Sequence, residues 1–215
     1  MVAILFISLL IFLPSNILGQ NTKSTMTVLP WGLQNDETLY VVIQKTHAVS
    51  FQKIEIVKST ILSKKTITID GKTMYEGWQG ALQKVSEYKT HFPMPKKLEI
   101  VESAPTTKVI TIIMSPTPAE NGYSGYTTFI ESDHMISKST ITIYDVNNLT
   151  NQELAALVRH EFGHALGLGH STEYGDLMYE EIDLNTAFIS DCNIHALASL
   201  YDGKILSQHF DQSEL

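Results

Sequence analysis

The sequence from residue 160 to residue 171 reads HEFGHALGLGHS, and no other part of the 215-residue chain concentrates as much chemistry. His160 and His164 are four residues apart, so on a helix their side chains rise from one face, one turn apart. Two imidazoles at this spacing can bind one tetrahedral zinc ion. Glu161 lies between them in sequence and is rotated off the metal position, where a carboxylate can act as a base on metal-bound water.

The glycines that follow allow the chain to turn back toward the metal. Gly167 and Gly169 both favour left-handed backbone at the end of a helix, and His170 can then supply a third nitrogen. The alternative, that these histidines are ordinary residues on a half-exposed helix, is weakened because a glycine and a third histidine fall at fixed offsets. The pattern therefore predicts a zinc site made of His160, His164 and His170, with Glu161 as the catalytic base.

The full pattern, HExxHxxGxxH, resembles the signature of the metzincin zinc endopeptidases. Ser171, directly after the third histidine, is similar to the serine of the matrixins, the matrix metalloproteinase family. Met178 follows His170 by eight residues, at the spacing of the matrixin Met-turn, whose methionine lies beneath the zinc. Glu180 departs from the family, which usually has proline there, and this affects the expected shape of the specificity pocket.

The resemblance implies an α+β fold of the metzincin or zincin-like kind: a twisted, mostly parallel sheet, an active-site helix and a small C-terminal helical subdomain. It also implies a secreted zinc endopeptidase that hydrolyses protein or peptide substrates through a zinc-bound water activated by Glu161. Two alternatives stay open, namely a catalytically inactive zinc-binding protease-like module and a structural zinc site in a surface-anchored binding protein. The presence of Glu161 argues against the first, and the lack of an evident fourth ligand argues against the second.

Length and charge limit the other function classes. The chain is long enough for one domain with a real core. Its 23 acidic and 15 basic residues give a net charge of −8, and no lysine-rich run is present. Nucleic acid is therefore excluded as an expected partner, and composition gives no indication of the oligomeric state.

The N-terminus predicts export. Val2 to Leu13 is almost wholly apolar, too short to cross a bilayer as a helix but suited to the core of a secretion signal. We therefore expect a signal at 1–19, a short segment at 20–35 and a metzincin catalytic domain at 36–215. No Lys or Arg precedes the apolar run, so an uncleaved anchor at the cell surface, or a buried helix, is the lesser alternative to a secreted, extracellular protein without a stable membrane span.

The single cysteine and the isolated histidine outside the motif predict no further site. Because Cys192 is the single cysteine of the sequence, no internal disulfide can form, and Cys192 is expected to be a small buried residue. Animal matrixins are typically held latent by a propeptide cysteine, and no cysteine lies between Gly19 and Trp31. Matrixins often bind a second zinc and calcium as well, but His134 has no partner at a ligand spacing and is expected to be a solvated surface residue. Structural calcium is left unassigned, with nearby oxygen sources at Glu120, Glu131, Asp133 and Asp145.

The remaining patterns predict the elements around this site. β-Branched and aromatic runs predict strands at 39–43, 98–101, 109–114, 126–130 and 139–144, with 109–114 central. By the resemblance, 125–130 is the edge strand above the cleft. Helical spacing predicts a helix over 74–89 with Trp78 in the core, and a last helix that starts at Ser190 or Asp191 and ends at Gly203.

Local signals mark one helix start and one hairpin. Thr150 and Glu153 form a capping box that starts the histidine-bearing helix. Residues 45–73 are interpreted as a possible β insertion, with strands at 54–57 and 66–69 and a turn at Asp70–Gly71.

Overall fold

The computed structural model describes residues 28–33, 38–103, 106–120, 122–184 and 187–204, so the expected signal at 1–19 lies outside the described residues. Its centre is a five-stranded sheet in the order β4-β1-β5-β7-β6. The strands are β1 (Thr38–Lys45), β4 (Lys97–Ile100), β5 (Val109–Met114), β6 (Gly125–Ser132) and β7 (Met135–Ile143). Only β6 is antiparallel to its neighbour, and it lies at the edge, whereas β5 is central. The five strands predicted outside residues 45–73 are thus confirmed, as are the central place of 109–114 and the edge place of 125–130.

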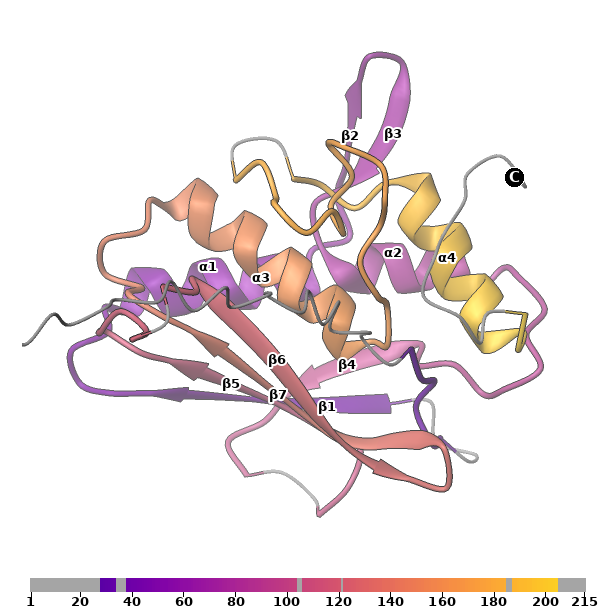
Figure 1. Ribbon diagram of the computed structural model, residues 1–215, viewed down its shortest axis with the longest axis horizontal. Coiled ribbons are helices and arrows are strands. Elements are labelled where there is room, and N and C mark those ends of the chain that lie inside the picture. Colours follow the sequence, from indigo (N-terminus) through magenta and orange to yellow (C-terminus); the bar gives the residue numbers. More distant parts are fainter. Residues whose placement is uncertain (1–27, 34–37, 104–105, 121, 185–186, 205–215) are drawn as a thin grey trace, which may run out of the picture.

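The helices cover one face of this sheet (Figure 1). Helix α3 (Asn151–Ala165) crosses the sheet beside α1 (Phe51–Leu62), and α2 (Trp78–Val85) and α4 (Asp191–Tyr201) pack together further along the chain. One continuous apolar core joins the layers, and several of its members have no exposed surface, including Leu39, Ile110, Ile112, Ile141 and Phe162. The predicted α+β fold, with a mostly parallel sheet and an active-site helix, is confirmed.

Residues 45–73 differ from the prediction in their first half. The predicted strand at 54–57 is wrong, because these residues lie within helix α1. The buried positions Ile54, Val57 and Ile61 recur every three or four residues, which is the helical period, and a four-residue window is too short to distinguish it from alternation. Ser50 begins the helix, since its side chain accepts a hydrogen bond from the Lys53 amide at 3.3 Å.

The second half of this region forms the predicted hairpin. Strands β2 (Thr66–Ile69) and β3 (Lys72–Tyr75) pair in antiparallel fashion around Asp70–Gly71. Both turn residues have left-handed backbone, with φ of 51° and 76°, as a two-residue hairpin turn requires. The hairpin is separate from the main sheet and projects away from it at the top of Figure 1.

Helix α2 is shorter than the predicted 74–89, because Met74 and Tyr75 belong to strand β3. Trp78 is fully buried as predicted, and its indole N–H donates to the Arg159 carbonyl of α3 at 2.9 Å. A second indole approaches α3 from the other end: Trp31 is also buried and donates to the Ala165 carbonyl at 2.8 Å. The two tryptophans therefore tie α3 to α2 and to the segment at 28–33.

The C-terminal helix begins and ends as predicted. Ser190 and Asn193 form a reciprocal capping box at the start of α4, and Gly203 follows the helix with a φ of 73°. Cys192 is half-buried in the first turn, so it is less buried than expected, because it lies between exposed Asp191 and buried Asn193 at the margin of the packed face of α4. None of the helices in the described ranges is long and apolar enough to cross a membrane.

Candidate metal centre

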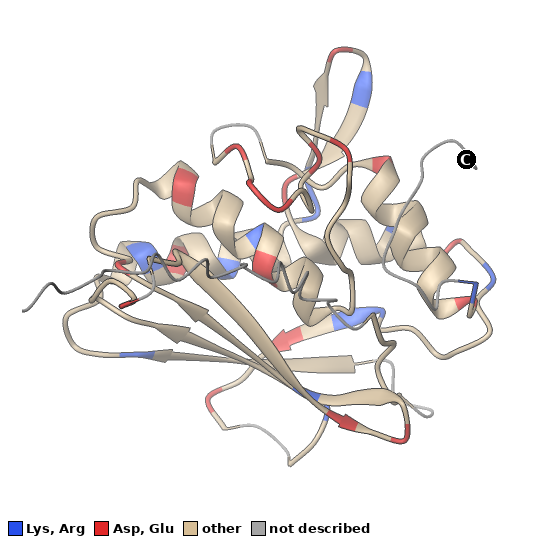
Figure 2. Ribbon diagram, in the orientation of Figure 1, with Lys and Arg blue, Asp and Glu red and all other residues tan. Residues whose placement is uncertain are grey.

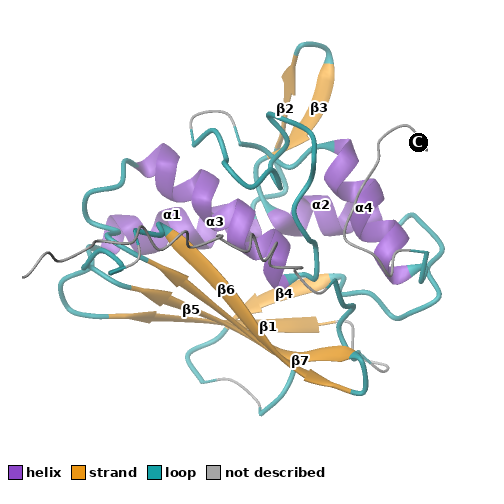
Figure 3. Cartoon of the chain, in the orientation of Figure 1, coloured by secondary structure: helices purple, strands orange, loops and turns teal. Residues whose placement is uncertain are grey.

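Helix α3 positions the first two histidines. Thr150 accepts from the Glu153 amide at 3.2 Å, and the Glu153 carboxylate accepts from the Thr150 amide at 2.7 Å, so the predicted capping box is present. Leu154, Val158 and Phe162 anchor the helix in the core with no exposed surface. The helix ends where the chain enters the long loop toward α4 (Figure 3).

The turn after α3 brings the third histidine back. Gly167 has a φ of 104° and lies so close to the segment at 28–33 that a β-carbon there would be 2.1 Å from the Leu29 carbonyl oxygen. Gly169 has no left-handed backbone, so the turn needs only the first of the two glycines. Ligand atoms of His160, His164 and His170 all lie within 4.8 Å of one another.

Hydrogen bonds determine which nitrogen of His160 and of His164 is free to bind a metal. His160 Nδ1 is 2.7 Å from the Leu177 carbonyl and His164 Nδ1 is 2.9 Å from the Leu168 carbonyl. A carbonyl oxygen only accepts, so each Nδ1 carries the proton and donates it, which leaves a lone pair on each Nε2.

These lone pairs provide a test of whether the residues fit a metal. The two Nε2 atoms are 3.0 Å apart, and two facing lone pairs repel unless a cation lies near both. Tetrahedral zinc with bonds of about 2.0–2.1 Å separates its ligand nitrogens by about 3.3 Å. Burial also lowers the pKa of His160 to about 4, and lowers those of His164 and His170, so the imidazoles are neutral at pH 7, as ligands must be. The donor set fits zinc.

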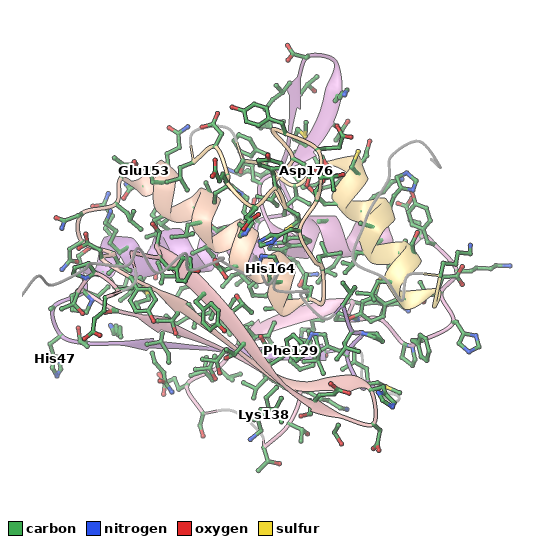
Figure 4. The ribbon with its side chains drawn as sticks, in the orientation of Figure 1. His47, Phe129, Lys138, Glu153, His164 and Asp176 are labelled. Carbon is green, nitrogen blue, oxygen red and sulfur yellow. The ribbon has the colours of Figure 1, made fainter. Side chains whose placement is uncertain are left out.

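The turn that carries Met178 packs against α3 and contacts the site through the Leu177 carbonyl. The Met178 amide donates to Asp176 Oδ1 at 2.7 Å, and its carbonyl accepts from the Ser171 amide at 2.7 Å. A β-carbon at Gly163 would be 2.4 Å from Met178 Sδ, so the thioether packs directly on α3 between the two histidines in sequence. Asp176 lies in the loop between α3 and α4 (Figure 4).

Glu161 is enclosed beside this group. Its side chain is only 6% exposed, and one carboxylate oxygen accepts from the Thr127 hydroxyl of β6 at 2.6 Å. Burial raises the pKa of Glu161 to about 7, although the hydrogen bond from Thr127 acts in the opposite direction. Thr127 was not identified from the sequence, where its only signal is its place in the predicted edge strand.

Arg159 is a second residue that sequence reasoning missed. Its guanidinium is buried between elements: Nε donates to the Glu76 carbonyl at 2.8 Å, and a terminal nitrogen donates to the Ala187 carbonyl at 3.0 Å. It also lies 4.6 Å from the centre of the Phe188 ring. Burial lowers the pKa of Arg159 to about 10. The residue before the first histidine thus connects α3 to the segment that leads into α4.

The loop between α3 and α4 is acidic, as Figure 2 shows. It carries Glu173, Asp176, Glu180, Glu181 and Asp183, and no Lys or Arg occurs between Arg159 and Lys204. Glu180, which occupies the usual proline position, is exposed. Its charge raises the pKa of His170, against the larger lowering that burial causes. This departure from the family therefore acts on a predicted ligand electrostatically.

The expectations for other metals differ in outcome. His134 is 95% exposed and approaches Glu131 at 3.2 Å, which confirms a surface histidine. Among the described residues, His160, His164 and His170 are the one group of His, Cys, Asp or Glu side chains placed to hold a metal. The oxygen sources Glu120, Glu131, Asp133 and Asp145 form no such group, and calcium is not supported.

Comparison with known proteins adds one match. The matrixin family model matches residues 113–202, which extend from the end of β5 through α3 to the end of α4. The match contains the three histidines, Glu161 and Met178, and it confirms the resemblance based on the motif. No curated protein matches the chain.

Proposed function

We propose that the protein is a secreted zinc-dependent endopeptidase whose catalytic domain includes residues 113–202, which match the matrixin family model. The observation that carries the proposal is the convergence of three imidazoles beside a buried carboxylate. His160, His164 and His170 would hold the ion, and the Leu177 and Leu168 carbonyls keep two of the rings in the tautomer that ligation needs. When bound, zinc supplies a Lewis acid that polarises the peptide carbonyl and makes water more acidic.

Glu161 carries the proton transfers. Its carboxylate accepts a proton from the attacking water and later donates it to the leaving amine. A pKa raised to about 7 by burial suits both steps at neutral pH, because the group is neither a very weak base nor a very weak acid. Met178 has no bond-making role and packs beneath α3.

The substrate is a protein or peptide, and strand β6 offers the surface for it. Among the described residues, this strand pairs only with β7, and it lies at the edge of the sheet. An extended chain can add to such an edge through backbone hydrogen bonds. Because Thr127 of β6 contacts Glu161, a peptide aligned on this strand would pass close to the proposed base.

Secretion and the domain limits of 1–19, 20–35 and 36–215 are part of the same proposal. Their support is the short apolar run Val2–Leu13, and the family is usually extracellular. The alternatives explain the site less well. An inactive module has no need of a buried Glu161, and a structural zinc site needs a fourth ligand, whereas no further His, Cys, Asp or Glu of the described residues joins the three histidines.

The test is hydrolysis of casein that o-phenanthroline abolishes and added zinc restores. Glu161→Ala should bind one zinc per chain like the wild type, yet lose about 10²–10⁴-fold in turnover, the usual contribution of a general base. Glu99→Ala, a partly exposed carboxylate on strand β4 at the opposite edge of the sheet from β6, is the matched control and should retain full activity. Normal turnover in Glu161→Ala would remove the assigned base, and absence of cleavage by the wild type would favour the inactive module.

A further inference from the structure

Strand β6 contacts the Glu161 carboxylate on both sides. The Thr127 hydroxyl lies 2.6 Å from Glu161 Oε2, which is the short distance of a hydrogen bond to a charged acceptor. The other oxygen faces the strand backbone, because a β-carbon built at Gly125 would be 2.7 Å from Glu161 Oε1. The two strand residues therefore leave the carboxylate little freedom to rotate.

The burial pattern of β6 shows that the Thr127 side chain points inward, toward α3. Along the strand, Tyr126 and Thr128 are exposed, whereas Thr127 is only 7% exposed and faces α3. The same hydroxyl lies 3.1 Å from the backbone carbonyl of Glu161. A hydroxyl has one proton, so its shorter contact, to the carboxylate, is the stronger one.

We propose that Thr127 is a positioning residue that holds the Glu161 carboxylate in the orientation needed for proton transfer, an inference that rests on the proposed function. The edge strand then has two roles in one reaction. Its outer backbone aligns the peptide, and one inward hydroxyl fixes the group that acts on the water. Alignment of the substrate and orientation of the base are thereby set by the same element.

A purely structural role is the competing explanation, since the hydroxyl could merely fasten β6 to α3. Thr127→Val removes the hydroxyl at nearly constant volume, and Thr127→Ser restores it. For the zinc-loaded full chain with a fluorogenic peptide chosen from the casein cleavage sites, we expect Thr127→Val to lower kcat about tenfold. KM and zinc content should stay within about twofold of wild type, and Thr127→Ser should recover most of kcat.

Thr60→Val is the matched control, because Thr60 is also buried, and among the described residues its hydroxyl bonds only within α1, to the Ile56 carbonyl at 2.8 Å. It should leave kcat and KM unchanged. A Thr127→Val enzyme with wild-type kcat, or one in which only KM or zinc content changes, would overturn the proposal.

A thermal double-mutant cycle gives a readout that needs no catalysis. In zinc-loaded protein, Thr127→Val should lower Tm by about 3 °C or more when Glu161 is present, and by clearly less in the Glu161→Ala background. Equal shifts in both backgrounds would show that the hydroxyl does not act on the carboxylate, and would overturn the proposal. If the wild type cleaves nothing, the proposed function fails, while this cycle still decides whether Thr127 holds Glu161.

Discussion

At the scale of single residues, the orientation of the imidazoles depends on two backbone carbonyls that come from different loops. Leu168 belongs to the turn directly after α3, and Leu177 belongs to the turn that carries Met178. The second turn is held by Asp176. Its carboxylate accepts from the Met178 amide at 2.7 Å, and its two oxygens accept from the Asn193 side chain of α4 at 2.9 and 3.1 Å. Asp176 thus links the last helix to His160 without touching it.

We therefore expect Asp176→Ala to weaken both the fold and the metal site. Loss of these hydrogen bonds to a charged, largely buried group should lower the free energy of unfolding by about 2–3 kcal/mol. Zinc affinity should fall about 10–100-fold, as for other groups that orient ligands. Urea unfolding and competition with a zinc chelator measure the two effects. Glu181→Ala, in the exposed part of the same loop, should change neither, and unchanged zinc affinity in Asp176→Ala would contradict the expected link.

At the scale of elements, local signals predicted α3 well. Its capping box at Thr150 and its left-handed Gly167 are contained within a few residues of sequence, so the start and end of the helix could be predicted. The strand expected at 54–57 failed because the burial of Ile54 and Ile61, which reveals the helical period, depends on tertiary packing of α1, chiefly against α3.

The contacts of Thr127 and Arg159 could not be predicted for a related reason. Their partners are 34 residues away in the case of Thr127, and 83 and 28 residues away in the case of Arg159. No local pattern encodes such pairs. The sequence indicated which imidazoles converge, but the tautomers depend on carbonyls whose positions only the fold determines.

The capping box gives a prediction at this scale. Thr150→Ala removes the acceptor for the Glu153 amide and should lower the free energy of unfolding by about 1–2 kcal/mol. Thermal unfolding should show this as a fall in Tm of about 2–8 °C. Thr150→Ser keeps the oxygen and should lose only a small part of the stability. Equal losses in the two variants would mean that the side-chain oxygen is not what stabilises the start of α3.

At the scale of the whole molecule, the proposed zinc site couples metal binding to folding. Two ligands belong to α3 and the third to the loop that leads to α4, so the ion would join segments that separate on unfolding. At zinc concentrations about 100-fold above Kd the gain is about 2.7 kcal/mol, or about 5–11 °C in Tm. Calorimetry should show this gain in wild type and in Glu161→Ala, but not in His164→Ala. A gain that survives in His164→Ala would place the metal elsewhere.

Acid should lower the stability of the fold through His160. Burial holds the pKa of His160 near 4, below its ordinary 6.5, so the unfolded chain takes up protons first as pH falls. The stability from the neutral imidazole is present above pH 6.5 and is lost as pH falls through about 4. Glu161 has the opposite effect on the pH dependence of stability. Burial raises its pKa to about 7, so the stability that its protonated form contributes is lost as pH rises through that value. Comparison of wild type with His160→Gln from pH 7 to 4 isolates the histidine contribution, and parallel pH curves would contradict it.

The two indole contacts of α3 have a practical consequence. The chain contains only two tryptophans, and their N–H groups bind the carbonyls of Arg159 and Ala165, which bracket the segment from His160 to His164. Intrinsic tryptophan emission therefore arises from indoles at both ends of the segment from His160 to His164, and a red shift would report local opening there before global unfolding. Replacing one indole by phenylalanine makes the other a single-site optical sensor, so the order in which the two ends of the motif come apart can be followed without attaching a label.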